Sequence, residues 1–285
     1  MGGVVTRVEY PHMSTFRVGL FALSITACLT CPASAQGARE GTLAEKSQNP
    51  IGSLISVPFQ NNMNFGVGTL DRTQNVTLFQ PVAPIGLNPD WNLIVRPITP
   101  ITYQPPLFRG DSSDFGIGDI QLQTYFVPKE FAPLPGGGFT WGVGPVLQAD
   151  SATDPRLGTG KWAAGVGGVL FFAIKPFTYG ALLNNIWSFA GDGNRANVNL
   201  MTLQPFINYN MKGGWYLTSS PVMIANWEAT NENRFTIPLG GGFGRIFNVG
   251  KQPINAQIQA FSYADKPAGG PDWTLRTQWT FLFPK

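Results

Sequence analysis

From about residue 54 to the C-terminus, the sequence is a series of short segments in which apolar and polar residues alternate with a period of two. The segments are rich in Val, Ile, Phe, Tyr, Trp and Thr, and clusters of Gly, Pro, Asn and Asp separate them. Such alternation is typical of β-strands that have one apolar and one polar face. Twelve segments can be counted, near residues 54–65, 74–86, 91–104, 118–129, 139–149, 160–174, 178–190, 197–211, 215–227, 235–248, 253–264 and 274–283.

The polar face of these segments is mostly neutral. Gln121 and Gln123 occupy it in the fourth segment, and Gln257 and Gln259 in the eleventh. Only 12% of the chain is charged, about half the usual share in soluble domains. A soluble β-sandwich carries Lys and Glu on its outer face, whereas an outer-membrane barrel turns its apolar face to lipid and its polar face to a wet lumen. The pattern predicts an all-β fold, a transmembrane antiparallel outer-membrane β-barrel of about twelve strands.

The connections between the segments alternate in length and charge. Those after even-numbered segments are mostly tight and basic, as at Lys175-Pro176, Lys212-Gly213-Gly214 and Gly250-Lys251-Gln252, although the connection 129–138 is long. In bacterial barrels the short turns are periplasmic and the long loops extracellular. The expected extracellular loops hold ten of the 16 acidic residues, which would bind the divalent cations that bridge lipopolysaccharide: Asp71, Asp111, Asp114, Asp150, Asp154, Asp192, Glu228, Glu232, Asp265 and Asp272.

Eight prolines fall inside the expected strands, where each removes one donor from the hydrogen-bond ladder. They are Pro58, Pro81, Pro84, Pro97, Pro100, Pro205, Pro221 and Pro238. We expect either bulges at these positions or strands that are split into two shorter ones.

The first 35 residues have the layout of a secretory signal peptide. Arg17 precedes the apolar run 18–27, and Ala33-Ser34-Ala35 offers a cleavage site that leaves Gln36 as the new N-terminus. A lipoprotein signal that leaves a lipidated Cys28 is the alternative. No later window approaches 18 consecutive apolar residues, which argues against a membrane-spanning helix. We therefore expect a signal peptide at 1–35, a periplasmic segment or lumen plug at 36–53, and the barrel at 54–285.

Both cysteines, Cys28 and Cys31, and the one histidine, His12, lie in this leader. A chain cleaved after Ala35 therefore contains no Cys or His metal site, no Ser-His-Asp triad and no Cys-His dyad. The stretch Gly158-Thr-Gly-Lys161 lacks the Ser or Thr that a phosphate-binding loop places after its lysine. The sequence predicts no enzyme activity, no cofactor and no bound metal.

Three arginines, Arg96, Arg245 and Arg276, fall inside expected strands. An arginine that faces lipid at the bilayer midplane costs about 2–4 kcal/mol. We therefore expect all three in the lumen, together with the four glutamines named above. There they would form an anion-favouring constriction, or they would brace the barrel by pairing with carboxylates such as Asp119.

Seven parts of the chain, distributed over nearly all of the expected mature protein, share a family resemblance. They are Asn49-Pro-Ile-Gly52 with Val57-Pro-Phe-Gln-Asn-Asn62, Leu157-Gly-Thr-Gly-Lys-Trp162, Leu183-Asn-Asn-Ile-Trp-Ser-Phe-Ala-Gly191, Gln204-Pro-Phe-Ile-Asn-Tyr-Asn210, Gly214-Trp-Tyr-Leu-Thr-Ser-Ser-Pro221, Ile237-Pro-Leu-Gly-Gly-Gly242 and Gly270-Pro-Asp-Trp273. The chain resembles a family of Gram-negative outer-membrane proteins labelled as transporters and grouped with a component of the meta-pathway of phenol degradation. The resemblance implies a barrel of about this size and a transport role, and it implies no functional residues.

The sequence therefore predicts an outer-membrane channel or transporter for the passive passage of small solutes, anionic or aromatic ones among them. The alternative is a plugged structural or adhesive barrel whose acidic surface loops carry the function. The expected partners are outer-membrane lipids and lipopolysaccharide, the outer-membrane assembly machinery and a small-molecule solute. A net charge of +3 gives no reason to expect nucleic acid.

Overall fold

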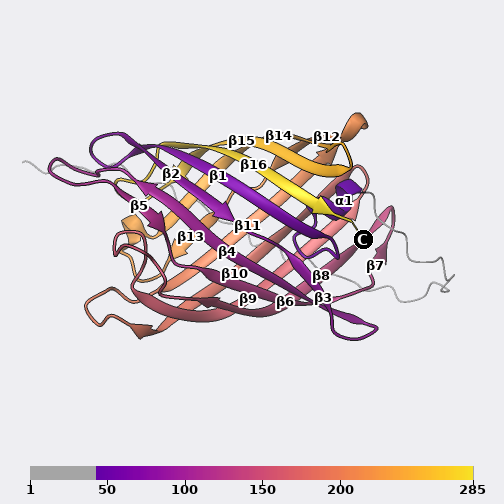
Figure 1. The fold of residues 1–285 in the computed structure, drawn as a ribbon, viewed down its shortest axis with the longest axis horizontal. Helices are drawn as coiled ribbons and strands as arrows, with labels where there is room; N and C mark the ends of the chain where they lie inside the picture. Colours follow the sequence, from indigo (N-terminus) through magenta and orange to yellow (C-terminus); the bar gives the residue numbers. More distant parts are fainter. Residues whose placement is uncertain (1–42, 285) are drawn as a thin grey trace, which may run out of the picture. The chain divides into compact units, whose positions relative to one another are not determined.

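The computed structural model describes residues 43–284, and within this range the chain is an all-β barrel with three short helices. The expected signal peptide, the alternative lipidation site at Cys28 and residues 36–42 lie outside the described range. Among the described residues, no helix is both long and apolar enough to cross a bilayer. Figure 1 shows the strands inclined around a common axis.

The strands are β1 (Ile55–Val67), β2 (Arg72–Phe79), β3 (Ala83–Gly86), β4 (Trp91–Gln104), β5 (Asp114–Ile117), β6 (Gln121–Pro128), β7 (Ala132–Leu134), β8 (Gly137–Gln148), β9 (Lys161–Ile174), β10 (Phe177–Gly191), β11 (Asn199–Asn210), β12 (Trp215–Ser219), β13 (Met223–Asn226), β14 (Phe235–Val249), β15 (Gln252–Asp265) and β16 (Trp273–Phe283). The helices are α1 (Leu43–Gln48), η1 (Lys212–Gly214) and η2 (Asn231–Asn233).

These sixteen strands form a closed antiparallel barrel of twelve strands, as predicted. Three of the twelve are interrupted, because β2 and β3, β5 and β6, and β12 and β13 each share their neighbours across a short break. The short strand β7 pairs with β8 and lengthens the connection between β6 and β8. The first and last strands pair along their length, from Ile55 opposite Phe283 to Phe65 opposite Trp273.

Two of the breaks coincide with prolines in the expected strands. Pro81 lies between β2 and β3, and Pro221 lies between β12 and β13. A bulge between Ile237 and Pro238 accommodates a third proline. At these three prolines the expectation of bulges or split strands holds, because proline cannot donate to the ladder and the pairing is displaced around it. The other five keep a continuous register: Pro58, Pro84, Pro97, Pro100 and Pro205.

The lumen is apolar along one part of its wall. A buried cluster there joins side chains from five strands with Val82, just before β3, and with Ile51 of the segment that precedes β1: Ile51, Val82, Ile94, Tyr125, Val127, Val169, Phe171, Leu182 and Phe206. Helix α1 and the C-terminus lie at the same end of the barrel, where the tight turns are (Figure 1). Residues 43–54 thus lie against the inside of the wall at this end.

Candidate functional site

A polar cavity of about 140 Å³ lies inside the barrel, between residues 47–50 and the opposite wall. Its lining is dominated by the amide side chains Gln48, Asn49, Gln60, Gln80, Gln204, Asn208, Asn255, Gln257 and Gln278. Among residues 43–284, Arg96 is its one charged lining residue and no carboxylate side chain contributes to it. The cavity can therefore accept a polar or anionic solute, and it offers a cation no charged partner.

Arg96 points into the lumen from β4 and is held by glutamines. It donates from Nη2 to Oε1 of Gln80 (2.6 Å) and from Nη1 to Oε1 of Gln123 (3.4 Å). Gln123 in turn donates to Oε1 of Gln121 (2.6 Å) and accepts the hydroxyl hydrogen of Tyr125 (3.1 Å). Two of the four glutamines predicted for the lumen, Gln121 and Gln123, thus help to orient Arg96. The sequence analysis missed Gln80, the nearest partner of Arg96.

Arg276 has a different environment. It donates from Nε to Oδ1 of Asn62 (2.9 Å) and from Nη1 to the carbonyl oxygen of Ser220 (2.7 Å). Its guanidinium lies 4.7 Å from the centre of the Phe261 ring. With only 6% of its surface exposed and no place in the cavity lining, Arg276 connects β16 and β1 with the break before β13.

Gln259 completes the support of that break. Its Oε1 accepts the backbone N–H of Ser220 (3.0 Å), and its Nε2 donates to the Ser220 hydroxyl (3.0 Å). Both backbone groups of Ser220, left without a ladder partner beside Pro221, are therefore satisfied by side chains. Gln259 and Arg276 thus stabilise the barrel wall through hydrogen bonds to Ser220, whereas Gln257 lines the cavity.

Asp119 does not pair with the lumen arginines. Its carboxylate accepts the backbone N–H and the hydroxyl of Thr159 (both 2.7 Å) and the backbone N–H groups of Ser151 and Ala152 (both 3.3 Å). It therefore holds the loop between β8 and β9. Among residues 43–284, neither Arg96 nor Arg276 takes part in an ion pair, so the expected compensation by carboxylates is not found.

Arg245 lies on the outer face of the barrel, so its expected place in the lumen is wrong. It lies opposite Trp215 on the neighbouring strand and on the same face of β14 as the exposed Phe243. Gly244, between them, faces inward against Tyr216. Its guanidinium lies 5.1 Å from the centre of the Trp215 ring. Arg245 stands four residues before the end of β14, close to the tight turns, where an outward charge costs only about 0–1 kcal/mol.

The segment before β1 is bonded to the inside of the barrel. Gln48 donates to Oδ1 of Asn210 (2.8 Å) and accepts from the hydroxyl of Thr178 (2.6 Å) and from Nδ2 of Asn210 (3.2 Å). Ile51 is 2% exposed within the apolar cluster. Asn49 shapes the turn between them by accepting the backbone N–H of Ile51 through its side chain (3.0 Å).

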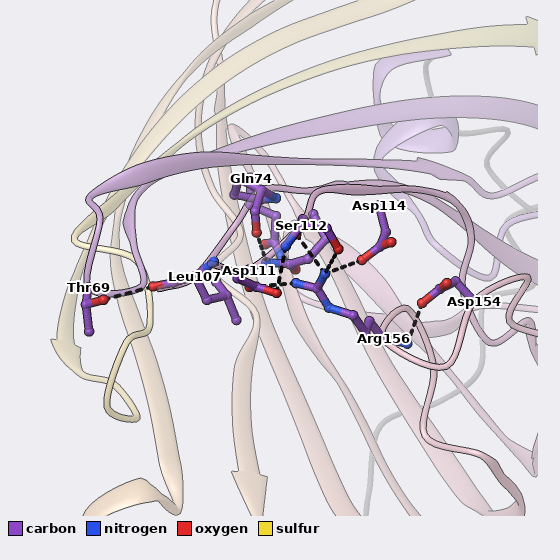
Figure 2. Close-up of polar contacts among 10 residues, drawn as sticks. Thr69, Gln74, Leu107, Asp111, Ser112, Asp114, Asp154 and Arg156 are labelled. Carbon is purple, nitrogen blue, oxygen red and sulfur yellow. Dashed lines mark hydrogen bonds and ion pairs between the residues drawn. The ribbon is translucent and has the colours of Figure 1, made fainter. Parts of the chain in front are cut away.

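The loops at the far end of the barrel are bonded to one another. Figure 2 shows Arg156, from the loop 149–160, between Asp111 and Asp114 of the neighbouring loop and strand. The ion-pair distances are 2.9 Å to Asp111 and 2.5 Å to Asp114, and Arg156 also donates to the carbonyl oxygen of Ser112 (2.7 Å). Asp154 accepts the backbone N–H of Arg156 (2.8 Å).

Further bonds continue this network around the rim. Thr69 donates its backbone N–H to Leu107 (2.8 Å), and Gly68 donates to Gly269 (2.9 Å). On the other side, Arg195 donates to the carbonyl oxygens of Pro155 (2.9 Å) and Gly158 (2.5 Å). These bonds join neighbouring loops along the rim, in addition to the contacts that Arg156 makes with Asp111, Asp114 and Asp154.

The fold has known counterparts among solved structures. An outer membrane channel from Pseudomonas putida F1 superposes with a TM-score of 0.58 at 15% identity, over 86% of this chain and 100% of that one. The outer membrane phospholipase of Salmonella typhi, solved as a dimer with bound calcium, gives 0.46 at 12% identity over 85% and 98%. No family model matches the chain, and no curated protein matches it in sequence. The chain is a β-barrel of the outer-membrane type, and the grouping with phenol degradation gains no support from a family match.

Proposed function

We propose that the protein is an outer-membrane channel through which small polar solutes diffuse passively, with a weak preference for anions. The observation that carries this proposal is the cavity lining, in which the described part of the chain places Arg96 and many amides but no carboxylate. A fixed positive charge in a narrow, low-dielectric passage raises the local concentration of anions. Amides and hydroxyls replace part of the hydration shell of a passing solute without binding it tightly.

Within this proposal, Arg96 sets the charge preference and Arg276 braces the wall. Arg96 lines the cavity, whereas both of Arg276's hydrogen-bonding partners belong to the barrel itself. Arg245 makes no contribution to selectivity, because it lies on the outer face.

The segment 43–54 narrows the passage near the end with the tight turns. Gln48 and Ile51 bind it to the wall, and residues 47–50 form one side of the cavity. These contacts also favour the second candidate, a barrel closed by its N-terminal segment. The adhesive version of that candidate has less support, because Asp111, Asp114 and Asp154 are engaged within the loop network.

Single-channel recording with liposome uptake tests the proposal. We expect small, reproducible conductance steps from the folded protein in planar bilayers, and uptake of small organic anions such as benzoate into liposomes. Benzoate is a small aromatic acid, one of the anionic solutes that the sequence analysis expects to pass. The absence of both steps and uptake would refute an open channel. If steps arise only after removal of residues 43–54, the closed barrel is the correct description.

A further inference from the structure

The outer face of the barrel carries a basic site at the end where the tight turns lie. Arg245 of β14 is exposed and stacks on Trp215, the first residue of β12. Phe243, half exposed, is tilted against Trp215, with ring centres 6.2 Å apart. An arginine beside two lipid-facing aromatics near a rim can bury its apolar stem in the bilayer and raise its guanidinium to headgroup level.

A second exposed cation lies in the turn beside this part of β14. Lys212 belongs to the turn that leads into Trp215, and it is exposed. This turn lies against β14, because a Cβ atom on Gly214 would come within 2.2 Å of the carbonyl oxygen of Ile246, the residue after Arg245. The exposed Lys251, in the turn after β14, adds a third cation to the same stretch of rim.

The carboxylates described at this end of the barrel have other partners or places: Glu45 of helix α1 pairs with Lys175 (3.7 Å). The turns 211–214 and 250–251 contain no carboxylate side chain. The acidic turn residues at this end, Asp90 and Glu130, follow β3 and β6 in another part of the barrel. The rim next to β12 and β14 is therefore locally positive.

We propose that Arg245, Lys212 and Trp215 form a binding site for the headgroup of an anionic glycerophospholipid in the inner leaflet of the outer membrane. Arg245 and Lys212 bind the phosphodiester, the indole of Trp215 lies at the level of the glycerol backbone, and Phe243 contacts the acyl chains. The site selects phosphatidylglycerol over zwitterionic lipids, because it offers no carboxylate to a choline or ethanolamine group. This inference depends on the membrane placement of the barrel and does not depend on channel activity.

Native mass spectrometry of the full-length folded protein tests the site. The protein is released from detergent after equilibration with either phosphatidylglycerol or phosphatidylcholine, and the lipid-bound fraction is measured. We expect phosphatidylglycerol to be retained preferentially and Arg245→Gln to weaken its retention about fivefold, the usual effect of one basic residue at an anionic membrane surface. Lys129→Gln is the matched control, because Lys129 is a cation in a turn at the same end that donates instead to the carbonyl oxygen of Asn88.

Each outcome decides the proposal. Equal retention of the two lipids, or wild-type retention by Arg245→Gln, overturns it, and so does a loss of equal size in Lys129→Gln. Displacement of the lipid by millimolar inorganic phosphate would mark a site for free anions and overturn the lipid assignment. Should Arg245→Gln fail to fold, Arg245→Lys keeps the charge and is expected to retain most of the lipid, whereas Lys212→Gln is expected to lose it.

Discussion

The guanidinium of Arg276 donates a 2.7 Å hydrogen bond to the carbonyl oxygen of Ser220, which lies beside Pro221 in the break between β12 and β13. A residue of the last strand thus completes the wall at a point where proline interrupts the ladder. Arg276 and Gln259 together replace the strand partners that Ser220 lacks. The arginine is therefore part of the barrel wall.

The first prediction concerns this brace. Arg276→Gln shortens the side chain and leaves the half-buried carbonyl of Ser220 without its partner, which should cost about 1–3 kcal/mol of unfolding free energy. Urea unfolding in lipid vesicles, followed by the intensity of tryptophan fluorescence, measures the loss. Arg245→Gln removes the same charge from the outer face and should change stability by less than about 0.5 kcal/mol. Equal stability of the two variants would show that Arg276 does not brace the wall.

The second prediction concerns the segment before β1. Ile51→Ala removes most of a buried side chain from the apolar cluster, and such truncations cost about 2–5 kcal/mol. We expect the cost to appear as release of residues 43–54 from the lumen, with larger conductance steps and faster trypsin cleavage after Lys46. Ser53→Ala, at an exposed neighbouring position, should behave like the wild type. Unchanged cleavage and conductance in Ile51→Ala would argue against a segment that is held by this contact.

The third prediction concerns the loop network of Figure 2. Arg156→Ala removes both ion pairs to Asp111 and Asp114, and partly exposed pairs of this kind contribute about 0.2–1 kcal/mol each. Hydrogen exchange should accelerate in residues 105–113 and 149–160, while the strands keep their protection. Arg109→Ala, which changes an exposed arginine of the loop 105–113, is the control. A uniform effect on the whole barrel would contradict a local role for Arg156.

Much of this fold can be predicted from the sequence, because its strands are amphipathic in a simple way. The expected segment 91–104 coincides with β4, and the charged loops separate the strands where expected. Even the prolines were informative, since Pro81 and Pro221 mark real breaks. Period-two alternation survives in a barrel because each strand separates lipid from lumen along its whole length.

The error at Arg245 has a physical cause. The cost of an outward arginine was taken at the bilayer midplane, but Arg245 lies near the rim, where that cost is small. Phe243, two residues earlier, shares the face of Arg245 and is apolar. This neighbour was the available sign that the face points to lipid. Three consecutive glycines earlier in β14, at 240–242, contribute no side chains that would have distinguished the two faces.

The contacts of Gln48 and Ile51 could not be predicted in the same way. Residues 43–54 have no strand period, and their position depends on a complementary surface that several distant strands build together. The sequence therefore indicated that a plug could exist, and only the fold shows which residues contact the wall.

The reversal potential under a salt gradient tests the central claim most directly. Across a planar bilayer with a tenfold KCl gradient, we expect the wild-type protein to favour chloride over potassium, because Arg96 is the one charged residue of the described chain that lines the cavity. Arg96→Gln should move the reversal potential toward potassium, and Arg245→Gln, which removes an equal charge from the outer face, should leave it unchanged. A wild-type preference for potassium, or equal shifts in the two variants, would contradict this account.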